Sequence, residues 1–132
     1  MITFVDTNVL LDIFLPDPDW GEESLKSFEM AFDEGSMITD EIVYAELAPQ
    51  FSGKNLLDET LASLGIQVVP LGLDTAYKAG LIWKEYRAAG GRRKSVLVDF
   101  FIGAHALNRA DRLLTRDRGF YKKHFGSLEI LY

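Results

Sequence analysis

The chain has 132 residues, 48% of them apolar, and this composition is typical of one folded domain rather than a disordered chain. It has no cysteine, which excludes a disulfide framework, a thiolate zinc site and a cysteine nucleophile. Its two histidines leave little scope for a His-based metal site, and its net charge of −6 argues against nucleic acid as a partner.

Short apolar runs alternate with longer amphipathic segments along the whole chain. The short runs predict strands over residues 2–5, 37–39, 66–69, 112–115 and 128–131. The segments between them predict helices over residues 9–15, 20–33, 41–47, 54–64, 75–89, 96–109 and 120–124. We expect Asp19, Asp40 and Asp74 to cap the second, third and fifth helices. Strands that alternate with helices indicate an α/β domain whose parallel sheet is covered on both faces.

The sequence shows no linker-like composition shift, repeat or low-complexity segment, so we expect a single domain over residues 1–132. It has no basic signal-peptide start and no apolar run of membrane length, and Asp6 and Asp12 interrupt its first apolar segment. Together with the lack of cysteine, these features predict a cytoplasmic protein without membrane association.

Four carboxylates follow the predicted strands. Asp6 comes directly after the first strand, and Asp117 lies two residues beyond Thr115, where the fourth strand ends. Glu46 lies in the helix after the second strand, and Asp99 lies in the first turn of the sixth helix. Because ligands of parallel sheets bind at the carboxyl ends of the strands, we expect these four side chains near one edge of the sheet.

Two interpretations of these acids are open. Taken alone, an Asp near a helix start is most often a cap, and an Asp after a strand is often a turn residue. Taken together, four carboxylates repel one another and require either protonation or a divalent cation. Asp99 and Glu46 have apolar or small neighbours on their own helices, which supply no Lys or Arg to neutralise them. Oxygen ligands suit Mg²⁺ or Mn²⁺ rather than zinc, and such sites activate water against phosphodiesters.

Four motifs in sequence order carry a resemblance to a known family. They are VDTNVLL at residues 5–11, YAEL at 44–47, VDFFIGAHA at 98–106 and LTRDRGF at 114–120. In this order and spacing they resemble the motifs of PIN-domain ribonucleases, and in particular those of VapC-type toxins of bacterial and archaeal toxin–antitoxin pairs. The resemblance extends over residues 2–131.

The resemblance implies a three-layer α/β/α domain with a central parallel sheet of four to five short strands. It also implies an endoribonuclease that hydrolyses RNA, depends on Mg²⁺ or Mn²⁺, pairs with a cognate antitoxin protein and forms a homodimer. The residues that match the family's acidic positions, as catalytic groups and metal ligands, are Asp6, Glu46, Asp99 and Asp117. The residues that match its supporting polar positions are Thr7, Asn8 and Thr115.

Basic side chains are concentrated in the second half of the chain. Residues 1–77 carry 15 acidic and two basic side chains, whereas residues 78–132 carry 12 basic and five acidic ones. This asymmetry reflects either solvated helix faces or an acidic centre beside a basic flank. The candidates for contact with RNA phosphates are Arg92, Arg93, Lys94, Arg116 and Arg118, followed by Lys122, Lys123 and His124. Alternatively, residues 92–94 form a solvated loop and Arg116 balances the acidic cluster.

For several other residues we prefer a structural interpretation to a functional one. His105 lies about 600° around its helix from Asp99, so we expect a packing or surface histidine on the far side. We expect Asp12 to be a solvated helix residue and Gly103 to permit close helix packing. The helical spacing of three aromatic residues favours a core or dimer face over base stacking. These residues are Tyr77, Trp83 and Tyr86.

Two rival functions remain open at this point. A carboxylate-based hydrolase of small phosphoesters also has an Asp after its first strand, but its aspartyl-phosphate version expects Asp-x-Asp where this chain has Asp6-Thr7-Asn8. A non-catalytic RNA- or protein-binding module on the same fold would have lost one or more of the acids. The sequence contains no dinucleotide-binding, P-loop or nucleophile-elbow motif.

Overall fold

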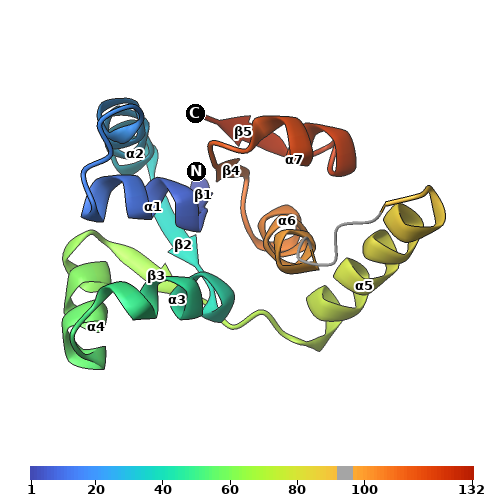
Figure 1. Ribbon diagram of the computed structural model, residues 1–132, viewed down its shortest axis with the longest axis horizontal. Coiled ribbons are helices and arrows are strands. Elements are labelled where there is room, and N and C mark those ends of the chain that lie inside the picture. The colour runs from blue at the N-terminus through green and yellow to red at the C-terminus, as the bar shows by residue number, and fades with distance from the viewer. Residues whose placement is uncertain (92–96) are drawn as a thin grey trace.

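The computed structural model describes residues 1–91 and 97–132, and these residues form a five-stranded parallel sheet with helices around it (Figure 1). The strands are β1 (Ile2–Val5), β2 (Ser36–Thr39), β3 (Ile66–Val68), β4 (Arg112–Leu114) and β5 (Glu129–Leu131). Their order is β3-β2-β1-β4-β5, and every neighbouring pair is parallel. The predicted parallel sheet of four to five short strands is therefore confirmed.

Helices form a layer on each side of the sheet. In the described residues they are α1 (Thr7–Phe14), α2 (Gly21–Glu34), α3 (Glu41–Leu47), α4 (Lys54–Ser63), α5 (Leu73–Ala88), α6 (Leu97–Arg109) and α7 (Arg118–His124), with a 3₁₀ turn over Ala48–Gln50. α1 to α4 lie on one side of β1 and β2, and α5 and α6 lie on the other (Figure 1). The predicted three-layer α/β/α architecture is confirmed. Within the described ranges, no helix has the length and apolar character needed to cross a membrane.

The central strand β1 brings distant parts of the chain to one edge of the sheet. Phe4 and Val5 are fully buried, because β1 lies between β2 and β4 and is covered on both faces. Val5 is in register with Leu114 of β4, and the Asp6 N–H group donates to the Leu114 carbonyl over 2.9 Å. The residues that directly follow these two strands therefore emerge side by side.

The helix caps agree with the sequence prediction only in part. Asp40 caps α3 as predicted, because its Oδ1 accepts two backbone N–H groups at the helix start. Asp19 does not cap α2, because Asp17 accepts the Asp19 N–H group and forms a turn before the helix begins. Gly72 precedes α5, so Asp74 lies in the first turn of that helix rather than at its cap.

Candidate metal centre

Asp6 lies at the carboxyl edge of the sheet, between the end of β1 and the start of α1, and only 5% of its surface is exposed. Its Oδ1 accepts the Thr7 N–H group over 2.7 Å and so caps α1, which begins two residues before the predicted start. Its Oδ2 accepts the Thr115 hydroxyl over 2.8 Å, with the Asn8 amide at 3.5 Å. The three predicted supporting polar residues thus converge on one carboxylate.

The environment of Asp6 disfavours its ionised form relative to a carboxylate in water. Its pKa is raised from the ordinary 3.8 to about 7, chiefly because burial removes the carboxylate from water. Hydrogen bonds from Thr115 and from the Thr7 N–H group act in the opposite direction. The negative charges of Asp99 and Glu46 raise the pKa further, which means that both acids lie within electrostatic reach of Asp6.

Glu46 is held at this edge by a contact between two helices. It is an exposed residue near the end of α3, and its Oε1 accepts the Thr7 hydroxyl over 2.7 Å. Thr7 belongs to the first turn of α1, so one residue binds Glu46 through its side chain and Asp6 through its backbone. The capping of α3 by Asp40 fixes the helix that presents Glu46.

Asp99 and Asp117 approach the same region from α6 and α7. Asp99 lies in the first turn of α6 and is half-buried. Asp117 occupies the N-cap position of α7, but in the described chain its side chain makes no capping hydrogen bond, and it is exposed. Its N–H group donates to the Thr115 hydroxyl over 3.1 Å. The Asp117 side chain therefore does not cap α7, contrary to the cap interpretation.

Tyr121 is a member of this site that the sequence did not single out. It is fully buried, and its hydroxyl lies 3.4 Å from the Asp6 Oδ2. Burial raises the pKa of this phenol, and the charges of Asp6, Asp99 and Asp117 raise it further, so that it stays a neutral donor. Its position four residues after Asp117, one turn along a helix, is the signal that could have revealed it.

The donors suit a hard divalent cation. Four carboxylates and the hydroxyls of Thr7 and Thr115 offer oxygen ligands only, which Mg²⁺ and Mn²⁺ prefer. The charges of Asp99 and Glu46 disfavour the ionised form of Asp6, and a bound cation would relieve that repulsion. In the described ranges, no group of three or more Asp, Glu or His side chains is placed so that it could hold a metal ion. The four carboxylates lie on different parts of the fold, at the N-caps of α1 and α7 and within α3 and α6.

A comparison with protein families identifies the family of this chain. A family model of the PIN domain matches residues 3–126. The chain belongs to the PIN domain family. No curated protein matches the chain.

Solved structures to which this chain is similar include proteins from Rickettsia felis, Neisseria gonorrhoeae and Klebsiella pneumoniae. VapBC2 from Rickettsia felis, bound to a DNA fragment, is 20% identical with a TM-score of 0.72, covering 98% of this chain and 97% of its own. FitAcB from Neisseria gonorrhoeae is 22% identical with a TM-score of 0.71, covering 100% and 97%. A toxin–antitoxin complex from Klebsiella pneumoniae is 21% identical with a TM-score of 0.63, covering 90% and 89%. At these identities the likeness shows the fold.

The Arg116 side chain forms an ion pair with a buried acid of the same chain, Asp12. Its Nε lies 2.8 Å from Oδ2 of Asp12, its Nη2 lies 3.0 Å from Oδ1, and its guanidinium stacks over the Trp20 ring at 5.2 Å. Asp12 is 3% exposed and also accepts the Ser24 hydroxyl over 2.6 Å, so the expectation of a solvated helix residue is wrong. Its place between Leu11 and Ile13 was the signal, since a carboxylate inside an apolar run needs a partner.

The other basic candidates differ in what the structure describes. Arg118 is exposed and lies 5.8 Å from the Tyr132 ring. Lys122 and Lys123 are exposed on α7. The predictions for Arg92, Arg93 and Lys94 lie outside the described residues. The Arg116 guanidinium balances an acid, as the alternative interpretation proposed, although the acid is Asp12 rather than one of the four site carboxylates.

His105 is a buried packing residue of the PIN domain and not a surface one. Its Nδ1 lies 2.8 Å from Oδ2 of Asp40, with both side chains fully buried, and its ring packs against Phe4. Its Nε2 has no hydrogen-bond partner among the described residues. Because Asp40 also caps α3, this pair connects α6, which carries Asp99, to the helix that carries Glu46. A cross-helix role of this kind was not evident from the sequence.

Proposed function

We propose that this PIN domain is a metal-dependent endoribonuclease that hydrolyses RNA phosphodiester bonds. Asp6, Glu46, Asp99 and Asp117 are assigned as the carboxylates that hold Mg²⁺ or Mn²⁺. The observation that carries the proposal is the buried Asp6 carboxylate at the edge of the sheet, which Thr7 and Thr115 hold in one orientation and which lies within electrostatic reach of Asp99 and Glu46. Its pKa, raised to about 7, agrees with this arrangement. A buried group this unfavourable in its charged form is typical of a functional site.

The residues around Asp6 would give the site its rigidity. When bound, the divalent cation would activate a water and offset charge on the scissile phosphate. The Thr7 N–H group and the Thr115 hydroxyl hold the Asp6 carboxylate in one orientation. Tyr121 keeps a neutral hydroxyl near Oδ2. These contacts orient the carboxylate before substrate arrives, so no reorganisation is needed during the reaction.

The physiological role we infer is that of a toxin paired with an antitoxin. The motif resemblance points to VapC-type toxins, and one of the structures with this fold is a toxin–antitoxin complex. The partner would be the cognate antitoxin protein, the active form a homodimer and the compartment the cytoplasm. Co-expression with the neighbouring gene product, followed by co-purification, tests the partner.

The decisive experiment is an RNA cleavage assay. The wild-type chain is incubated with a mixed single-stranded RNA in Mg²⁺ or Mn²⁺, with and without EDTA. We expect cleavage only with the metal, and loss of at least about a hundredfold in Asp6→Asn and in Asp99→Asn. Asp33→Asn, an exposed acid on α2, is the matched control and should cleave normally.

Two additional measurements on the same protein, hydrolysis of a chromogenic phosphomonoester and RNA binding, distinguish the rival functions. Full activity in Asp6→Asn would refute the site assignment. Hydrolysis of a chromogenic phosphomonoester without RNA cleavage would establish the small-molecule phosphohydrolase. Stoichiometric, metal-independent RNA binding without cleavage would establish the non-catalytic module.

A further inference from the structure

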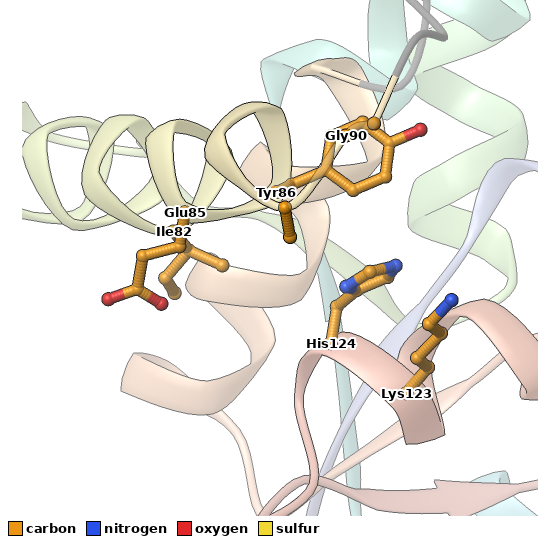
Figure 2. A pocket seen from close by; sticks show the side chains of 8 residues that line it. Ile82, Glu85, Tyr86, Gly90, Lys123 and His124 are labelled. Carbon is orange, nitrogen blue, oxygen red and sulfur yellow. The ribbon is translucent and has the colours of Figure 1, made fainter.

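A hollow of about 610 Å³ lies between the end of α5 and the end of α7, as Figure 2 shows. Its walls include Ile82, Glu85 and Tyr86 from α5, Gly91 from the turn that follows, and Lys123 and His124 from α7. The described lining residues include none of the four site carboxylates. We refer to this space as the Tyr86 hollow.

The aromatic walls of the Tyr86 hollow are held in place from behind. The Tyr86 and His124 rings meet edge to face, with centroids 5.3 Å apart and an interplanar angle of 87°. Both rings also pack against Phe100 of α6, at 5.4 Å and 5.5 Å. Phe100 is fully buried, so both rings lie against a close-packed side chain of the core.

The turn after α5 is shaped to lie on the Tyr86 ring. Gly90 has a φ of +92°, and the Gly91 N–H group donates to the Tyr86 carbonyl over 2.9 Å. A Cβ at position 91 would overlap the Tyr86 ring, so only glycine permits this close approach. The Gly90-Gly91 pair therefore lets the turn pack closely on the half-buried Tyr86 side chain, which lines the hollow.

Positively charged side chains lie on the α7 side of the hollow. Lys123 is exposed at the rim, and Lys122 precedes it on the same helix. Burial and the neighbouring Lys123 lower the pKa of His124, so its ring is a neutral aromatic surface near pH 7. An aromatic wall beside an exposed ammonium group is the combination that binds a base together with its phosphate.

We propose that the Tyr86 hollow binds one unpaired base of the RNA substrate, with Lys123 contacting a phosphate of the same strand. This inference rests on the proposed ribonuclease function. α7 runs from Asp117 at its start to His124 at its end, about 10 Å at 1.5 Å per residue. A stacked strand advances about 3.4 Å per nucleotide, so the bound base lies a few nucleotides from the cleaved bond. The hollow is thereby a subsite that selects single-stranded RNA.

A base explains the lining better than an acidic or an aliphatic ligand. Glu85 stands on the α5 side and would repel an acidic peptide, but its carboxylate can accept the N–H groups of a base. The aliphatic side chains of the described lining are Ile82 and the small Ala89, whereas a hydrophobic tail would require several large ones.

The test uses the full chain with Asp6→Asn, so that RNA binds without being cut. Fluorescent single-stranded RNAs, each with one abasic nucleotide at a different position, are titrated against this protein in Mg²⁺. We expect one position at which removal of the base weakens binding about tenfold. Adding Tyr86→Leu should abolish that dependence, whereas Tyr77→Leu, at an exposed tyrosine of the same helix, should preserve it. An equal abasic penalty with and without Tyr86→Leu overturns the proposal.

A second variant keeps the test valid if Tyr86→Leu unfolds the protein. Lys123→Gln alters an exposed ammonium group and leaves the ring packing intact. It should weaken binding to all the RNAs alike and reduce the slope of log affinity against log salt by about 0.7. An unchanged slope overturns the phosphate contact.

The outcome separates this inference from the proposed function. If the wild-type chain cleaves RNA but the abasic penalty is independent of Tyr86, the hollow is not a base subsite and the ribonuclease proposal stands. If the wild-type chain cleaves no RNA but the Tyr86-dependent penalty is present, the hollow binds RNA and the cleavage proposal fails.

Discussion

Asp6→Asn should make the metal-free protein more stable at alkaline pH while it abolishes activity. Asn keeps the size of the side chain and remains a good helix cap, but it cannot ionise. The pKa of Asp6 is raised from 3.8 to about 7, so folding disfavours the charged carboxylate. At about 1.4 kcal/mol per pKa unit, ionisation of Asp6 costs the folded state about 4 kcal/mol.

The pH range of this effect follows from the direction of the shift. Because the pKa is higher in the folded chain, the folded state binds the proton more tightly, and stability falls as pH rises from about 4 to about 7. Above pH 7 the full cost is present in the wild-type protein and absent in Asp6→Asn. The amide loses part of the hydrogen bonding from Thr115 and Asn8, so about 4 kcal/mol is an upper limit to the gain.

Urea unfolding in EDTA at pH 8 and pH 5 measures this difference directly. We expect a higher midpoint for Asp6→Asn than for the wild type at pH 8, and a smaller difference at pH 5. Mg²⁺ should raise the wild-type midpoint and leave that of the variant unchanged, since ligand binding stabilises only the form that binds it. If Asp6→Asn is less stable than the wild type at pH 8 without metal, then ionised Asp6 does not destabilise the folded protein and the reasoning is wrong.

Three further predictions concern the metal and the packing around the site. The apparent affinity for Mg²⁺, measured by calorimetry, should rise between about pH 6 and pH 8, because the proton that Asp6 holds with a pKa of about 7 competes with the cation; a flat profile would contradict this. Arg116→Gln leaves the buried Asp12 carboxylate without its cation and should destabilise the fold by about 3 kcal/mol in urea, whereas Arg118→Gln should change stability by less than about 0.5 kcal/mol. Gly103→Ala places a methyl group against the Phe125 ring and should cost about 1–3 kcal/mol, whereas Gly80→Ala, which meets open space on α5, should be neutral or stabilising by thermal unfolding.

Much of the fold was predictable because it depends on local patterns. The alternation of short apolar runs and amphipathic segments gave the parallel sheet, and the position of Asp6 and Thr115 directly after strands placed them at one edge. The three supporting polar residues, Thr7, Asn8 and Thr115, were assigned from the motif resemblance, and all three contact Asp6. The capping of α3 by Asp40 was predictable from its residue type alone.

The contacts that the sequence could not reveal join residues far apart in the chain. The Arg116 and Asp12 side chains are 104 positions apart, and the His105 and Asp40 side chains are 65 apart. Helix and strand periodicity in the sequence cannot indicate a contact between residues so far apart. Each of these side chains was therefore interpreted only from the residues next to it in the sequence. Trp20 is a similar case, because its stacking partner is set by the tertiary fold.

The central position of β1 has a consequence for synthesis of the chain. Asp6 and its hydroxyl partner Thr115 are 109 positions apart, so Asp6 is synthesised long before the residue that orients it. β4 can pair with β1 only after all the residues between the two strands have been made, and contacts of this sequence separation form slowly. A nascent chain that ends before β4 therefore cannot assemble the carboxylate site, because Thr115 and Asp117 are still missing from it.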